Sequence, residues 1–255
     1  MRKISLIIPT RDRPDLFKRC IESWQTCTVH PENIELVVIV NDDDLASQEY
    51  VKKVLSQHRM FKQKILLRPY TQFINRDFYN WGADQAEGDL VWILGDDVLA
   101  CGPMWDVHIN NVIDSTFQKW PDGIFCLSIK DNTPVPRADM PKFPCYPMFP
   151  RQVREAHGGW YLVPTIPTWG VDFIIYKIYY GLERLVQIHD RNYLNHVSYH
   201  NHQVVQPDAT NIRIGATFNL LKMRPEYSTD VYISNEVPKM IQMLQEKINN
   251  YGGVK

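Results

Sequence analysis

The chain has 255 residues, of which 44% are hydrophobic and 22% are charged, and its formal net charge is -1. This length suits one α/β domain over residues 1–255, and the apolar content excludes an intrinsically disordered chain. The near-neutral charge argues against a nucleic-acid partner or an anionic membrane surface.

Cysteine usage and hydropathy bear on the compartment. The five cysteines are scattered and form no CxxC pair, a pattern that favours reduced thiols over a disulfide framework. The apolar run at the N-terminus reaches Pro9 too early for a membrane span or a signal sequence. We therefore expect no transmembrane segment and a cytoplasmic protein.

Strand and helix patterns alternate over the first hundred residues. Apolar runs typical of parallel strands buried on both faces occur at residues 4–8, 36–40, 64–67 and 90–94. Helices are expected between them, at residues 15–24, 46–58 and 75–86. This alternation predicts a doubly wound, mostly parallel, Rossmann-like sheet.

The pattern changes after residue 100. Prolines and aromatic residues are interleaved up to Pro150, so residues 101–165 are expected to form long, mostly irregular connections over the active edge of the sheet. A helix at 171–182, a strand at 185–188 and an amphipathic helix at 236–249 should follow.

Polar residues follow three of the expected strands, at residues 10–12, 41–44 and 96–97. Ligands of doubly wound sheets bind at the carboxyl ends of the strands. Asp96 and Asp97 are adjacent carboxylates, which repel each other unless a positive charge compensates them. Mg²⁺ or Mn²⁺ bound together with a nucleoside diphosphate would supply that charge. The alternative is a solvated turn.

Four segments of the first hundred residues stand in the order of one known family. They are Ile4 to Arg11 (ISLIIPTR), Val37 to Asp43 (VVIVNDD), Asn80 to Leu90 (NWGADQAEGDL) and Gly95 to Asp97 (GDD). In these segments the chain resembles the GT-A glycosyltransferases, specifically the family 2-like inverting enzymes. The last segment falls where that family has its DXD motif, although the first acidic position is Gly95 here.

This resemblance implies a set of ligand-binding residues. Those expected to bind the nucleotide sugar are Pro9, Thr10, Arg11, Asp42, Asp43, Asn80 and Asp96. Asp97 and His196 are expected to hold Mn²⁺ or Mg²⁺. Residues 1–100 would then form the nucleotide-binding half, and residues 101–255 the acceptor-binding half.

The family also has an acidic catalytic base at the start of a helix after the metal motif. Asp172, at the end of the segment TWGVD, is the best match. The alternative role for this residue is helix capping. Glu183 and Asp190 are the second choices for the base.

Histidines, arginines and aromatic residues supply further candidates. A histidine cluster comprises His189, His196, His200 and His202; His200 is the second choice for the metal. The arginines that could neutralise phosphate charge are Arg11, Arg13, Arg68 and Arg76, with Arg11 favoured. Aromatic residues that could stack on an acceptor sugar, or simply pack in the core, are Trp160, Tyr161 and Trp169.

The sequence thus predicts a metal-dependent, inverting glycosyltransferase. It would move a sugar from a nucleotide diphosphate sugar, with UDP-sugar favoured, to a glycan or another hydroxyl acceptor. A sugar nucleotidyltransferase is a weaker alternative, because the turn from Pro9 to Arg13 contains no glycine. A catalytically degenerate carbohydrate- or nucleotide-binding module is the other alternative, because of Gly95.

Overall fold

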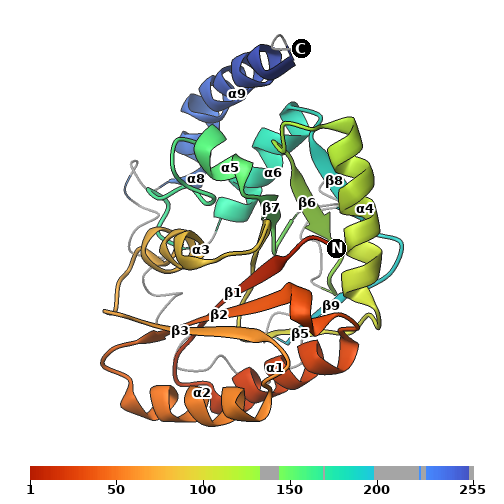
Figure 1. Ribbon diagram of the computed structural model, residues 1–255. Coiled ribbons are helices and arrows are strands. Elements are labelled where there is room, and N and C mark those ends of the chain that lie inside the picture. Colours follow the sequence, from red (N-terminus) through yellow and green to blue (C-terminus); the bar gives the residue numbers. More distant parts are fainter. Residues whose placement is uncertain (133–143, 169, 198–223, 225–227, 253–255) are drawn as a thin grey trace.

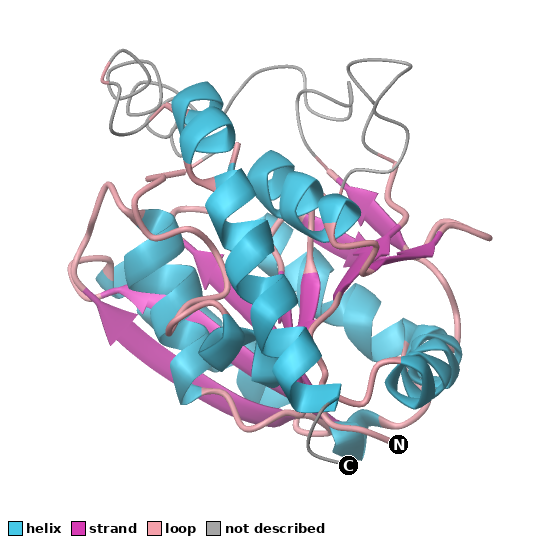
Figure 2. Ribbon diagram, turned by 90° about the horizontal axis from the view of Figure 1, so that it is seen from above, coloured by secondary structure: helices cyan, strands magenta, loops and turns pink. Residues whose placement is uncertain are grey.

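A computed structural model describes residues 1–132, 144–168, 170–197, 224 and 228–252. Within these residues a seven-stranded sheet lies between helices on both of its faces (Figure 1). Viewed from above in Figure 2, the helices of one face cover the strands. No helix in these ranges is both long and apolar enough to cross a bilayer.

The strand order of the main sheet is β3-β2-β1-β4-β7-β6-β8. Strands β1 to β4 run parallel, β6 and β8 are parallel to each other, and β7 is antiparallel to both of its neighbours. A separate antiparallel pair joins β5 to β9. The bounds are β1 (Ile4–Thr10), β2 (Ile34–Asn41), β3 (Lys62–Arg68), β4 (Leu90–Ile93), β5 (Val98–Ala100), β6 (Cys126–Ile129), β7 (Met148–Pro150), β8 (Leu185–Ile188) and β9 (Leu194–His196).

Helices connect these strands. Their bounds are α1 (Pro14–Cys27), η1 (Pro31–Asn33), α2 (Leu45–Gln57), η2 (Asn75–Asn80), α3 (Trp81–Gln85), α4 (Trp105–Lys119), α5 (Gln152–Ala156), α6 (Val171–Gly181), α8 (Thr229–Asn235) and α9 (Val237–Gly252). Helix α1 begins with Pro14, which suits a first helical position because that residue needs no N–H partner.

Alternate side chains of the central strands pack into two hydrophobic cores, one on each face of the sheet. Leu6 and Ile8 of β1 belong to the core that includes α1, α2 and α4. Ile7 belongs to the opposite core, which includes α3, α5, α6 and α9. A continuous apolar run is therefore what a strand buried on both faces requires.

The doubly wound, mostly parallel fold predicted from the sequence is confirmed. The expected strand at 185–188 coincides with β8, and the helix at 171–182 with α6. Strands from both halves of the chain enter one sheet.

The expectation that residues 101–165 are mostly irregular missed four regular elements. This stretch contains α4, β6, β7 and α5. Helix α4 packs through Trp105, Ile109 and Ile113, which recur at helical spacing and are fully buried.

Three tryptophans form a cluster beneath the end of β4. Trp24, Trp92 and Trp105 are fully buried, with ring centroids 5.1–5.4 Å apart. The indole of Trp24 donates a hydrogen bond to the backbone oxygen of Val98, at 3.2 Å. This cluster therefore fixes the first residue of β5, which directly follows Asp97.

We predict that Trp24→Phe lowers the free energy of unfolding by about 1–3 kcal/mol, because it leaves a small cavity and removes the indole hydrogen bond to the Val98 carbonyl. Urea unfolding followed by circular dichroism measures the change. Trp120→Phe is the matched control at a partly exposed ring, and an equal loss there would contradict the role assigned to the cluster.

Candidate functional site

The carboxyl ends of β1, β2 and β4 meet at one edge of the sheet because these strands are parallel and adjacent. After β1 the chain makes a tight turn in which Asp12 takes a left-handed conformation, with φ at 55°. The turn leads into α1 and sends the side chain of Arg13 toward the end of β4.

Asp96 is held by this turn. Its carboxylate accepts a hydrogen bond from the hydroxyl of Thr10 at 2.8 Å and one from Nη1 of Arg13 at 2.9 Å. The side chain is only 5% exposed. Burial raises the pKa of Asp96 above its ordinary value, against the positive charge of Arg13, which lowers it.

Asp97 faces a different element. Its Oδ2 lies 3.6 Å from Nε2 of His196 and 3.4 Å from Nη1 of Arg13. Burial acts to raise the pKa of Asp97, but the hydrogen bond and charge of His196, with the charge of Arg13, outweigh it and leave the pKa lowered.

Strand β9 brings His196 to the acidic pair. Val98 of β5 pairs with His196, and the backbone N–H of Val197 donates to the backbone oxygen of Asp97 at 2.8 Å. His196 is the histidine predicted from the sequence to hold the metal, and the structure brings it next to Asp97. His200 and His202 lie outside the described residues, whereas His189 contacts Ser128 at 3.3 Å.

Gly95 leaves room for the Asp97 carboxylate. A Cβ atom at position 95 would lie 2.5 Å from Oδ1 of Asp97, which is too close for two unbonded atoms. With Asp97 in its present place, a side chain at position 95 would force the carboxylate to move.

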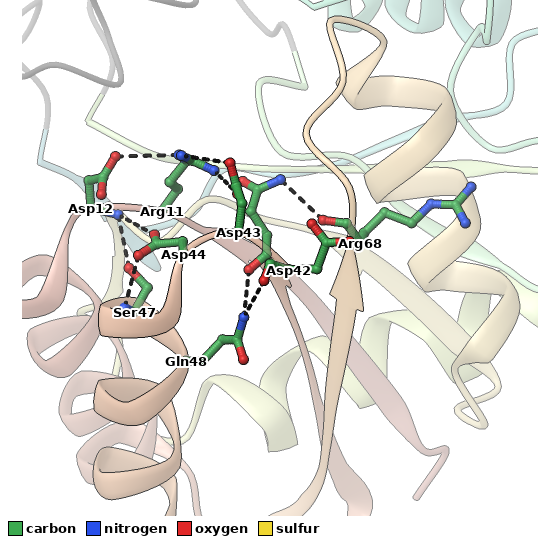
Figure 3. A network of polar contacts seen from close by, with 9 residues as sticks. Arg11, Asp12, Asp42, Asp43, Asp44, Ser47, Gln48 and Arg68 are labelled. Carbon is green, nitrogen blue, oxygen red and sulfur yellow. Dashed lines mark hydrogen bonds and ion pairs between the residues drawn. The ribbon is translucent and has the colours of Figure 1, made fainter.

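The end of β2 forms the second part of the site (Figure 3). Arg11 binds the carboxylate of Asp43, with Nη1 2.6 Å from Oδ1. The guanidinium of Arg11 lies 5.8 Å from the centre of the Tyr70 ring. Asp44 caps α2 by accepting from the N–H of Ser47 at 3.1 Å. The carboxylates of Asp43 and Asp44 therefore have different partners, an arginine and a helix N-terminus.

Asp42 and Asp43 are both exposed, whereas Asp44 is buried. Asp42 differs from Asp43 in its backbone contacts. Its backbone is tied down, because its N–H donates to the backbone oxygen of Arg68 at 3.0 Å and its own backbone oxygen accepts from Gln48 at 3.0 Å. Pro9 lies within β1, opposite Ile39.

Asn80 ties η2 to the loop before α6. Its Nδ2 donates to the backbone oxygen of Leu162 at 2.6 Å, and its Oδ1 accepts from the N–H groups of Tyr161 and Leu162 at 2.9 Å. Asn80 is only 6% exposed. These bonds engage both ends of its amide, so a contribution of Asn80 to nucleotide binding stays a prediction.

Asp172 lies in the first turn of α6. Its Oδ1 accepts from the N–H of Phe173 at 3.0 Å, and Gly170 before it adopts a left-handed conformation with φ at 89°. Burial raises the pKa of Asp172 to about 6, although backbone N–H groups of the turn act to lower it. A carboxyl with such a pKa can accept a proton near neutral pH.

The second choices for the base have other surroundings. Glu183 is exposed and has a left-handed backbone, with φ at 57°. Asp190 accepts from Arg191 at 3.1 Å and from the hydroxyl of Tyr193 at 3.2 Å.

The remaining candidates divide between surface and core. Arg76 pairs with the neighbouring Asp77 at 2.8 Å, and the guanidinium of Arg68 lies 4.6 Å from the ring of Trp81. Tyr161 is fully buried and packs in the core, so it cannot stack on an acceptor sugar. Trp160 is partly exposed, its ring 4.3 Å from that of His157; Trp169 lies outside the described residues.

Two tyrosines beside the acidic pair are absent from the set of residues predicted from the sequence. The ring of Tyr146 lies 5.3 Å from that of His196. Burial, together with the negative charge of Asp97, raises the pKa values of Tyr146 and Tyr79. Both tyrosines therefore stay protonated. Their closeness to Asp97 depends on the folded chain and has no local sequence signal.

The donor atoms at this edge are compatible with a divalent cation. Carboxylate and imidazole, as in Asp97 and His196, are ligand types that Mn²⁺ accepts. No group of three His, Cys, Asp or Glu side chains suited to a metal occurs in the described ranges. A cation here would complete its shell with phosphate oxygens and water, which is common for Mg²⁺ sites.

Comparison with known proteins concerns both sequence and structure. No protein family model matches the chain. A stretch of 103 residues, 40% of this chain, is 28% identical to 8% of the O-antigen biosynthesis protein RfbC of Myxococcus xanthus. The match thus spans less than a tenth of that relative.

Similar solved structures cover nearly the whole chain. S. aureus TarS matches 97% of this chain over 50% of its own, with a TM-score of 0.60 and 15% identity. TarS 1–349 in complex with UDP-GlcNAc gives a TM-score of 0.59 at 14% identity, over 99% of this chain and 73% of that one. The mannosyltransferase PcManGT from Pyrobaculum calidifontis, in complex with GDP-Man and Mn²⁺, gives 0.55 at 16% identity, over 100% and 76%. The strand order and these similarities together show that the chain has the fold of the GT-A glycosyltransferases.

Proposed function

We propose that this protein is a glycosyltransferase that moves a sugar from a nucleoside diphosphate sugar to an acceptor hydroxyl. One observation carries the proposal. The acidic pair at the end of β4 lies against the turn after β1, with Thr10 bound to Asp96 at 2.8 Å, in a fold whose solved examples include complexes with UDP-GlcNAc and GDP-Man.

The nucleotide would lie across the ends of β1 and β2. Arg11 and Asp43 form an ion pair there, and the neighbouring Asp42 is exposed. An exposed carboxylate accepts a hydrogen bond from a base that presents an N–H group. Uracil presents one, and we propose UDP-sugar as the donor, with a GDP-sugar as the alternative.

We predict that UDP binds at least about tenfold more tightly than ADP, because uracil presents a ring N–H where adenine has none and a hydrogen bond to a charged group contributes about 1.5–3 kcal/mol. GDP, whose guanine also presents a ring N–H, is the competing assignment. Calorimetric titration measures the three affinities. Asp42→Asn should weaken the preference, and Glu32→Gln, at an exposed carboxylate elsewhere, should leave it unchanged. Tighter binding of GDP would reverse the assignment of the base.

Asp97 and His196 are the proposed protein ligands of Mn²⁺ or Mg²⁺. A cation bound there would offset the negative charge of the diphosphate leaving group. The support is the 3.6 Å approach of their donor atoms, together with the Mn²⁺ in the PcManGT complex.

For this metal site we expect Asp97→Ala to abolish the additional rise in Tm that Mn²⁺ gives in the presence of UDP, since a ligand that binds only the native state raises Tm. Differential scanning fluorimetry measures it. Asp190→Ala, at a carboxylate on a different loop, is the control. An undiminished Mn²⁺ effect in Asp97→Ala would remove Asp97 from the metal site.

Asp172 is the proposed general base. It would accept the proton of the acceptor hydroxyl while that oxygen attacks the anomeric carbon, and a single displacement would invert the configuration. Its place in the first turn of α6 fixes the carboxylate, and its raised pKa, about 6, suits proton acceptance.

This role predicts the pH dependence of transfer. A base acts only when deprotonated, so the rate should fall about tenfold per pH unit below pH about 6. Asp172→Asn should lower the rate about 10²- to 10⁴-fold, remove that limb of the profile and leave UDP affinity unchanged. Glu183→Gln is the control. If Glu183→Gln lost transfer activity while Asp172→Asn kept it, the general base would be Glu183 and not Asp172.

The acceptor, the division into donor- and acceptor-binding halves and the compartment are inferred from the sequence. A glycan or another hydroxyl compound is the proposed acceptor, bound by residues 101–255, and the donor by residues 1–100. Scattered cysteines without a spacing pattern suit a reducing compartment, and we propose the cytoplasm. Hydrolysis of a UDP-sugar in the presence of Mn²⁺ would separate an active transferase from a binding module with the same fold.

A further inference from the structure

Arg13 lies between the two carboxylates of the acidic pair. Its side chain is 7% exposed, and a single nitrogen, Nη1, lies 2.9 Å from Oδ1 of Asp96 and 3.4 Å from Oδ2 of Asp97. The other oxygen of Asp96 accepts from Thr10 at 2.8 Å. Both oxygens of Asp96 are therefore engaged by the turn after β1.

The same oxygen of Asp97 faces two partners. Oδ2 of Asp97 lies 3.4 Å from Nη1 of Arg13 and 3.6 Å from Nε2 of His196. A divalent cation between Asp97 and His196 would therefore share this oxygen with Arg13. It would also lie close to the buried positive charge of the guanidinium, which repels it.

The net charge of Asp96, Asp97 and Arg13 determines how strongly this cluster attracts a cation. Two carboxylates and one guanidinium leave a single negative charge, so a cation on its own meets less attraction than an acidic pair suggests. A nucleoside diphosphate adds negative charge beside both the cation and Arg13. Binding of the diphosphate and of the cation should then favour each other, and this coupling is reciprocal.

We propose that Arg13 is a built-in counter-cation of the acidic pair, which makes metal binding at Asp97 depend on the nucleoside diphosphate. Arg13 and Thr10 occupy both oxygens of Asp96, and Arg13 shares Oδ2 of Asp97 with the cation. The metal site is therefore complete only when the donor is present. This inference rests on the proposed metal site. Arg13 acts through the two carboxylates and is a positioning residue.

Titration of the full chain with Mn²⁺, with and without UDP, tests the inference, and electron paramagnetic resonance counts the free ion. Wild-type protein should bind Mn²⁺ weakly alone and at least about tenfold more tightly with UDP, which lies within the usual range of coupling between two sites. Arg13→Gln should bind Mn²⁺ alone about tenfold more tightly than wild type, because a like charge is removed.

The Mn²⁺ affinity of Asp96→Asn should change in the direction opposite to that of Arg13→Gln. In Asp96→Asn the guanidinium has only Asp97 to neutralise, so Mn²⁺ affinity should fall. The double variant Arg13→Gln/Asp96→Asn keeps one negative charge, as in wild type, and should bind Mn²⁺ close to the wild-type affinity. Arg13→Lys, which keeps the charge, should also resemble wild type. A purely structural role of Arg13 would lower affinity in every variant.

The comparison of Asp96→Asn with the double variant holds even where Arg13→Gln alone does not fold, because the double variant keeps the wild-type net charge of the cluster and avoids the two unbalanced carboxylates of Arg13→Gln. Equal Mn²⁺ affinities in that pair, or an unchanged affinity in a folded Arg13→Gln, would overturn the inference and leave the proposed metal site standing. If the wild-type protein bound no Mn²⁺ even with UDP, both the inference about Arg13 and the proposed metal site would be wrong. Sugar transfer, assayed separately, decides the proposed function.

Discussion

The burial of two adjacent carboxylates is the constraint on which this site depends. Asp96 and Asp97 lie at the end of a central strand, where water is largely excluded, and such charges are tolerated only with partners that neutralise and hydrogen-bond them. Thr10, Arg13 and His196 are those partners. The turn after β1, the start of α1 and strand β9 must therefore converge on the end of β4, although they are far apart in the sequence.

Helix α1 fixes the acidic pair from two sides. Arg13, immediately before its first turn, supplies the charge, and Trp24 donates to the backbone oxygen of Val98 at 3.2 Å. The thiol of Cys20 contacts the same oxygen, also at 3.2 Å. One rigid element thus holds both the counter-ion and the strand that leaves the acidic pair, which is the kind of support that keeps a ligand site in place before the ligand arrives.

The sequence predicts those parts of this protein that depend on local pattern. The β-branched runs and the helical spacing sufficed for the fold, for β8 and for α6. Helix α4 was missed because the prolines that follow suggested irregular structure, although Trp105, Ile109 and Ile113 carried the helical period. The pairing of Arg13 with Asp96 was missed for a different reason. Repulsion between two carboxylates requires a positive charge, but the sequence cannot say whether an ion or a side chain 83 positions away provides it.

Gly95 departs from the acidic residue that the resembling family has at this position, and the departure has a steric consequence. A Cβ there would lie 2.5 Å from Oδ1 of Asp97, so the glycine is what allows the carboxylate to fold back toward Arg13 and His196. A carboxylate at position 95 would also add a negative charge to a cluster that one guanidinium already balances in part. The glycine and Arg13 are thus complementary, since one makes space for Asp97 and the other limits the charge.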